Sequence, residues 1–136
     1  MRPAAGALAL AAAAISAYLV VVHYSNGPVV CFAGGGCETV QKSAYSQIGP
    51  VPLSVLGLAV YVGIAVTTAF RGELAAIAGF ALGLSAGIFA VYLIVVQTAV
   101  LHAICVWCLA SDSIALVLVA LGVLRLRAEP VAQEPA

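Results

Sequence analysis

Residues 101–124 read LHAICVWCLASDSIALVLVALGVL, in which a short polar turn leads through two cysteines into a long apolar run. The apolar part, about 104–124, has the ~20 residues that a helix needs to cross a ~30 Å hydrocarbon core. Cys105 and Cys108 form a C-x-x-C pair at its start, and Asp112 follows one turn later. Such a pair indicates either thiol–disulfide chemistry or half of a zinc site, and the rest of the chain has to decide between them.

The composition of the whole chain is that of an integral membrane protein. Hydrophobic residues make up 65% of the 136 residues and charged residues 7%, against roughly 45–50% and about 25% in ordinary globular domains. The mean hydropathy is +1.20. Because the formal net charge is zero and no basic patch is visible, we expect the lipid bilayer, and no nucleic acid, as a partner.

Four apolar runs organise the chain. They cover about 4–22, 51–70, 74–100 and 104–124, and no strand-like alternation interrupts them. We therefore predict one all-α membrane domain over 1–136, a bundle of four transmembrane helices with an outer loop at about 25–50 and a tail at 125–136. The first run has an alternative interpretation as a cleaved signal peptide, although it is longer than a typical signal core.

The few basic residues predict the orientation in the membrane. Arg2, Arg71, Arg125 and Arg127 lie in regions that an even number of crossings puts on one side, whereas Lys42 is the only Lys or Arg on the other. Since basic loops stay in the cytoplasm, both termini are predicted to be cytoplasmic.

This orientation places all four cysteines in one outer compartment, where disulfides persist. Cys31 and Cys37 lie in the outer loop on either side of three glycines, 34–36, which favour a mobile pair. Cys105 begins a helix, whose N-terminal amides stabilise a thiolate. Cys108 is one turn deeper and is expected to face the space between the helices.

Two thiol pairs on one side of a membrane can pass two electrons by sequential disulfide exchange. No flavin, haem or nucleotide motif is visible, so a lipid-soluble quinone is the expected acceptor. Asp112 lies on the same helical face as Cys108, and a carboxylate within the membrane is usually functional. It can hydrogen-bond the quinone or relay a proton; alternatively it holds the bundle together with Ser111, Ser113 or Gln97.

The loop residues after Cys37 predict a short helix. Glu38 and Lys42 are spaced i,i+4 within CETVQKSAYSQI, which favours an ion pair on one helical face. This half-helix is expected to form a lid over the outer opening of the bundle.

Together these residues resemble the vitamin K epoxide reductase (VKOR) family, specifically its bacterial homologues that reoxidise periplasmic Dsb-type disulfide catalysts. The resemblance rests on C-x5-C at Cys31 and Cys37, Ser43 six positions later, VPLSVLGLAVY at 51–61, and the C-x-x-C at 105–108. It covers most of 31–115, and the order and spacing of the motifs make it specific.

The resemblance implies a quinone-dependent thiol–disulfide oxidoreductase of the bacterial inner membrane. Cys31 would meet a separate thioredoxin-fold partner, Cys37 would pass electrons to Cys105, and Cys108 would deliver them to a menaquinone, ubiquinone or vitamin K type quinone. Ser43 would support the half-helix. Many bacterial relatives carry a fused thioredoxin-like domain; none is expected in this chain, whose residues up to Ala136 offer only a short tail after the last apolar run.

Two positions depart from the vertebrate relatives. Asp112 stands where they have a tyrosine, and Leu53 where they have an asparagine for the quinone carbonyl. With Tyr61, these residues are the expected quinone contacts. The departures leave the relay intact, and they put epoxide reductase activity, the alternative function, in doubt.

Two other classes of protein fit less well. A non-enzymatic membrane protein would use the cysteines as structural disulfides or a zinc site, but five residues separate Cys31 from Cys37, more than in a usual zinc elbow. No metal is therefore expected. A transporter would show more intramembrane polar residues, and the stripe of Gly79, Gly83 and Gly87 is more typical of close helix packing.

Overall fold

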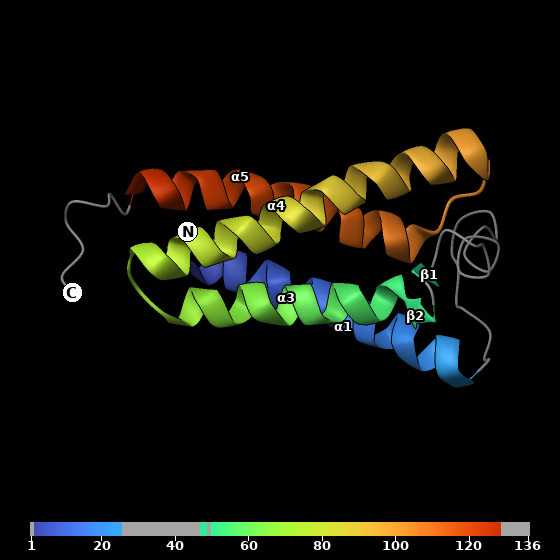
Figure 1. Ribbon diagram of the computed structural model, residues 1–136, viewed down its shortest axis with the longest axis horizontal. Helices are drawn as coiled ribbons and strands as arrows, with labels where there is room; N and C mark the ends of the chain where they lie inside the picture. Colours follow the sequence, from blue (N-terminus) through green and yellow to red (C-terminus); the bar gives the residue numbers. More distant parts are fainter. Residues whose placement is uncertain (1, 26–46, 49, 129–136) are drawn as a thin grey trace.

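Four long helices packed side by side form the molecule, as Figure 1 shows. The computed structural model describes residues 2–25, 47–48 and 50–128. The helices are α1 (Arg2–Ser25), α3 (Leu53–Ala69), α4 (Glu73–Val95), which continues as the π-helix η2 (Val96–Val100), and α5 (Val106–Ala128). Each of α1 and α4 packs against both α3 and α5, and successive helices run in opposite directions.

Three helical segments are long and apolar enough to cross a membrane: Pro3–Ser25, Glu73–Val100 and Val106–Arg127. The second predicted span, 51–70, is a shorter apolar helix, Leu53–Ala69, of 17 residues. The prediction of a helical membrane protein is therefore confirmed. We predicted four transmembrane spans, and three of them are helices long enough to cross a membrane.

A small hairpin precedes α3, where the sequence predicted only loop and helix. Strand β1 (Gln47–Ile48) pairs with antiparallel strand β2 (Val51–Pro52), with Ile48 opposite Val51. The residue before a proline avoids the α region, so Val51 is extended and the helix starts only after Pro52, whose ψ is 145°. Proline chemistry thus shortens the predicted span.

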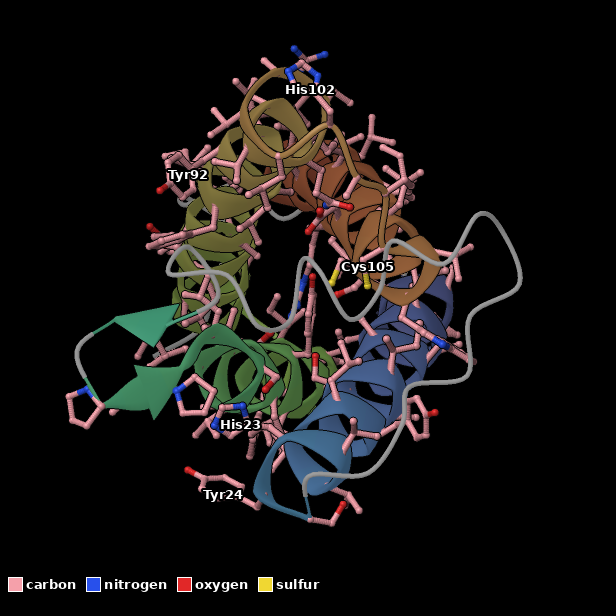
Figure 2. All side chains as sticks on the ribbon, turned by 90° about the vertical axis from the view of Figure 1, so that its right-hand side faces the viewer. His23, Tyr24, Tyr92, His102 and Cys105 are labelled. Carbon is pink, nitrogen blue, oxygen red and sulfur yellow. The ribbon has the colours of Figure 1, made fainter. Side chains whose placement is uncertain are left out.

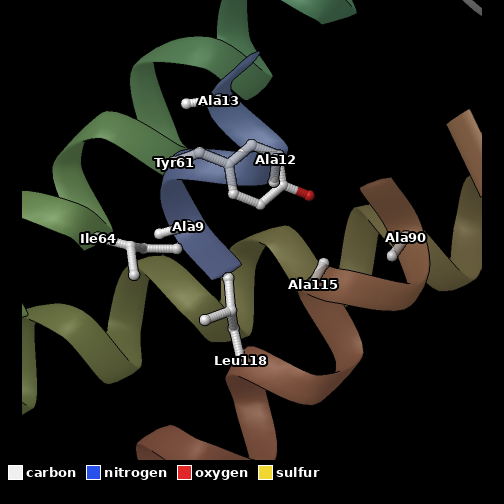
Figure 3. Packing of buried hydrophobic residues seen from close by; sticks show 8 residues of the cluster. All are labelled: Ala9, Ala12, Ala13, Tyr61, Ile64, Ala90, Ala115 and Leu118. Carbon is white, nitrogen blue, oxygen red and sulfur yellow. The ribbon is translucent and has the colours of Figure 1, made fainter. Parts of the chain in front are cut away.

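Small side chains fill the centre of the bundle, so the helices approach closely. Figure 3 shows this core, which consists of Ala9, Ala12, Ala13, Tyr61, Ile64, Ala90, Ala115 and Leu118. A Cβ atom on Gly87 would lie 2.6 Å from Val119 Cγ2 of α5. A Cβ on Gly83 would lie 3.7 Å from the Leu118 carbonyl oxygen. The glycine stripe of α4 therefore serves helix packing, as its spacing indicates.

The C-terminal end of α3 is held by a buried arginine. Arg125 Nη2 donates hydrogen bonds to the carbonyl oxygens of Thr67 (3.1 Å) and Phe70 (2.8 Å). The last carbonyls of a helix have no partner within it, so the guanidinium supplies one. The tail was predicted from 125, but α5 continues to Ala128 because Arg125 binds these carbonyls inside the bundle.

Several predictions lie outside the described residues. They concern Cys31, Cys37, Ser43, the half-helix lid and the tail beyond 128.

Candidate functional site

The last turn of α4 widens into the π-helix η2. Its characteristic bond runs from the N–H of Leu101 to the carbonyl oxygen of Val96, 2.8 Å away. Single π-helical turns frequently lie at functional sites. Gln97 belongs to this turn and is a polar side chain that is only 1% exposed.

A tight turn then brings the chain back beneath Gln97. His102 adopts a φ of 50°, a left-handed conformation that non-glycine residues adopt rarely, and it points away from the bundle at the edge of Figure 2. The Ala103 N–H donates to the carbonyl oxygen of Gln97 (3.0 Å). The Cys105 N–H donates to the side-chain Oε1 of Gln97 (2.7 Å). Backbone and side chain of Gln97 together fix the start of α5.

Cys105 occupies the N-cap position of α5 (Figure 2). Its carbonyl oxygen accepts from the N–H of Leu109 (2.8 Å), and its Sγ accepts from the N–H of Cys108 (3.3 Å). The side chain is fully buried among Leu101, Ala103, Val106 and Trp107. An amide donor at a helix N-terminus stabilises negative charge on sulfur, the environment that the sequence predicted for this cysteine.

One turn deeper, Cys108 lines a cavity of about 270 Å³ between the helices. Its walls are mostly apolar and come from α1, α3, α4 and α5; the largest of these side chains are Leu19, Leu53, Leu56, Val60, Phe89 and Leu93. Leu56 and Phe89 are 40% and 45% exposed, so the wall formed by α3 and α4 reaches the apolar outer surface. This cavity lies on the Cys108 side of the cysteine pair.

Within the described part of the chain, three buried polar atoms of the cavity residues have no hydrogen-bond partner. They are Ser54 Oγ, Gln97 Nε2 and Asp112 Oδ2. Leaving a buried polar group without a partner costs about 1–3 kcal/mol. An apolar cavity with a few convergent polar groups is the usual form of a small-molecule site, and a ligand with polar atoms would relieve this cost.

The three predicted quinone contacts, Leu53, Tyr61 and Asp112, all line this cavity together with Cys108. Tyr61 also links two helices: its hydroxyl donates to the carbonyl oxygen of Ser111 (3.0 Å) and accepts from Ser111 Oγ (3.1 Å). The structure therefore brings the three predicted residues together around one cavity, and their contact with a quinone stays a prediction.

The structural alternative for Asp112 paired its carboxylate with Ser111, Ser113 or Gln97. The three polar neighbours suggested for it bond elsewhere: Ser111 to Tyr61, Ser113 to the carbonyl oxygen of Leu109, and Gln97 to Cys105. Among the described residues, Asp112 Oδ2 is buried without a hydrogen-bond partner, and the residue is 5% exposed.

Sequence reasoning missed Ser54 and Gln97 as cavity residues. One signal was present, because Gln97 is the only glutamine within the four apolar runs. Gln97 is eight residues from Cys105 in the sequence, and helical periodicity does not predict a contact at that spacing. The π-helix and the turn create the contact. Across residues 2–25, 47–48 and 50–128, no three His, Cys, Asp or Glu side chains cluster closely enough to hold a metal ion.

Comparison with known proteins identifies the family. The model of the vitamin K epoxide reductase family matches residues 3–123, a stretch that includes most or all of each of the four helices, the cavity residues and both cysteine pairs. No curated protein matches the chain. Given the extent of the family match, the chain belongs to the vitamin K epoxide reductase family of membrane oxidoreductases.

Proposed function

We propose that the protein is a thiol:quinone oxidoreductase, which reoxidises a thioredoxin-fold disulfide catalyst and passes the electrons to a membrane quinone. The observation that carries this proposal is the position of Cys108. Its side chain lines an apolar cavity, while Cys105, the other member of the pair, is buried at the helix N-cap. One thiol pair thus stands between the outer end of the bundle and a site for a small apolar ligand.

A quinone matches the chemistry of the cavity. Its ring is apolar, and its two carbonyl oxygens accept hydrogen bonds. The exposed Leu56 and Phe89 suit an isoprenoid tail that extends from the cavity into the lipid. A lipid-soluble oxidant needs such a lateral opening, because it diffuses in the membrane.

In the proposed reaction, two electrons pass from the partner's dithiol through both cysteine pairs to the quinone. The partner's dithiol reduces the Cys31–Cys37 disulfide, and Cys37 then attacks Cys105 of the Cys105–Cys108 disulfide through a mixed disulfide. Once both thiols of the inner pair are reduced, they form their S–S bond again. The two electrons and two protons released convert the quinone to the hydroquinone.

Asp112 is the proposed proton-transfer group in this reaction. It lies one helical turn from Cys108 in the lining of the same cavity, and its Oδ2 has no partner among the residues that the structure describes. A positioned carboxyl group contributes typically 10²–10⁴-fold to a rate that depends on proton transfer. It would deliver a proton to the quinone oxygen as the electrons arrive.

The proposed setting is the bacterial inner membrane, with four crossings and both termini in the cytoplasm. α3 has 17 residues, about 25 Å at ~1.5 Å per residue, which is at the lower end of the range for a transmembrane helix. Its neighbours α1 and α4 run alongside it. Four crossings put both cysteine pairs and the separate Dsb-type partner in the periplasm.

Quinone reduction by the purified protein in liposomes tests this proposal, with a reduced thioredoxin-fold thiol protein as electron donor. We expect turnover that Cys108→Ser lowers by at least about 10³-fold, as for loss of a reacting nucleophile. Ser113→Ala is the matched control, because Ser113 is exposed on the same helix and bonds only within it. Undiminished turnover in Cys108→Ser would overturn the proposal.

A further inference from the structure

We propose that Gln97 binds the quinone: its Nε2 amide donates a hydrogen bond to a quinone carbonyl oxygen while its Oε1 holds the Cys105 backbone. The inference rests on the proposed function and deepens it. Gln97 touches both the redox pair and the cavity, since its side chain bonds the Cys105 N–H and also lines the cavity.

The orientation of the Gln97 carboxamide follows from the chemistry of its one partner. A backbone N–H can only donate, so the atom 2.7 Å from Cys105 N is the amide oxygen. The opposite end of the group is therefore the NH₂. Rotating the carboxamide by half a turn would bring two donors together, so the bond to Cys105 fixes the direction of the donor end.

That donor end has no partner among the described residues. Gln97 is 1% exposed, and its Nε2 is buried without a hydrogen bond. Water or lipid at the outer surface of the bundle cannot satisfy a group so deeply buried. A ligand in the cavity can, because an unpartnered buried donor gains its full hydrogen bond on binding.

The backbone holds this donor in place before any ligand arrives. Gln97 lies in the π-helix, and its carbonyl oxygen accepts from Ala103 while its side chain accepts from Cys105. Donors that are already oriented toward developing negative charge need no reorganisation during the reaction. The amide cannot release a proton, so it would stabilise the oxygen that becomes negative as the electrons arrive, and Asp112 would supply the proton.

Direct quinone binding separates this role from a purely structural one. Trp107 is the single tryptophan of the chain and adjoins Cys108, so quenching of its fluorescence by a short-chain quinone gives the Kd in the oxidised protein, where no electrons flow. A hydrogen bond also lowers the stretching frequency of the quinone carbonyl. Infrared difference spectra with a ¹³C-carbonyl-labelled quinone report that bond, which a structural glutamine would not alter.

Gln97→Met is the decisive variant, because it keeps the length of the side chain and removes the amide. We expect the Kd to rise by about tenfold or more, the usual effect of losing one hydrogen bond to a ligand, and the carbonyl frequency to shift upward. Thr98→Val is the matched control: Thr98 lies in the same π-helix, is exposed, and bonds the carbonyl oxygen of Ile94.

Equal Kd values and carbonyl frequencies in the native protein and Gln97→Met would overturn the inference and leave the proposed function standing. The same rise in Kd in Thr98→Val would also overturn it, because the effect would belong to the π-helix and not to the amide. If the native protein neither binds nor reduces any quinone, the proposed function and the inference both fall. Should Gln97→Met not fold, Gln97→Asn, which keeps the amide but withdraws it by one methylene, must show the higher Kd and the altered carbonyl frequency.

Discussion

The two ends of the bundle bury polar side chains in different settings. At the arginine end, formed by Thr67, Phe70 and Arg125, the guanidinium donates to two backbone carbonyls, and the neighbouring cavity measures about 20 Å³. At the cysteine end, formed by η2 and the start of α5, the cavity measures about 270 Å³. There Gln97 and Asp112 each keep a buried polar atom without a partner.

This difference separates polar groups that hold the fold from those available to a ligand. Arg125 fills a requirement created by the end of α3, because the last carbonyls of a helix need donors. No backbone requirement accounts for Asp112, or for the NH₂ group of Gln97. Substitutions at the arginine end should therefore change stability, and those at the cysteine end should change activity.

Among the variants that compare the two ends, Asp112→Asn should have the largest effect. The variant keeps the size of the side chain but removes its ability to transfer a proton, so quinone reduction should slow by about 10²-fold. Thermal unfolding in detergent should occur at the native temperature or above it, because a buried carboxylate without a full set of partners is lost. Native turnover in this variant, or a marked loss of stability, would break the comparison.

Arg125→Met should show the opposite pattern. The variant removes the charged donor from the carbonyls of Thr67 and Phe70, which should lower the free energy of unfolding by about 2–3 kcal/mol. Denaturant titration in detergent measures this loss. Turnover per folded molecule should stay at the native level, and Arg125→Lys, which keeps a charged donor, should recover part of the stability. A large loss of turnover in the folded variant would contradict the separation of roles.

A pair of glycine variants tests how tightly the region between the two ends is packed. Gly87→Ala places a Cβ 2.6 Å from Val119 Cγ2, whereas Gly83→Ala meets only an ordinary contact of 3.7 Å. Both variants gain the same helix propensity, so their difference in unfolding free energy reports overpacking, about 2 kcal/mol. Equal stabilities would mean that α4 and α5 adjust to the added methyl group.

Tyr61→Phe sharpens the comparison between the two ends, because Tyr61 lines the cavity but its hydroxyl has hydrogen-bond partners in the protein. Its hydroxyl bonds both the carbonyl oxygen and Oγ of Ser111, so the variant should lose about 1 kcal/mol of stability. Ser111→Ala, which keeps the carbonyl acceptor, should lose less. Tyr61→Phe could instead leave stability unchanged and slow quinone reduction as strongly as Asp112→Asn. Polar groups that already have protein partners would then also take part in the reaction, against the comparison.

The sequence by itself determined the membrane helices, because a long apolar run in lipid must satisfy its backbone internally and the helix does so within one segment. It also determined that Cys105 starts a helix with Cys108 and Asp112 on successive turns of one face, since helical periodicity is local. The VKOR resemblance was likewise carried by the order and spacing of short motifs, and the family match over 3–123 confirms it.

Only the tertiary structure decided what surrounds Cys108. The cavity takes residues from all four helices, and no local pattern specifies which side chains of separate helices meet. The π-helix and the left-handed His102 shift Gln97 onto the Cys105 amide, so a glutamine expected at most to support Asp112 bonds the redox pair. Hydrogen-bond partners depend on assembled distances and not on residue type, which is why the unpartnered atoms became visible only in the folded bundle.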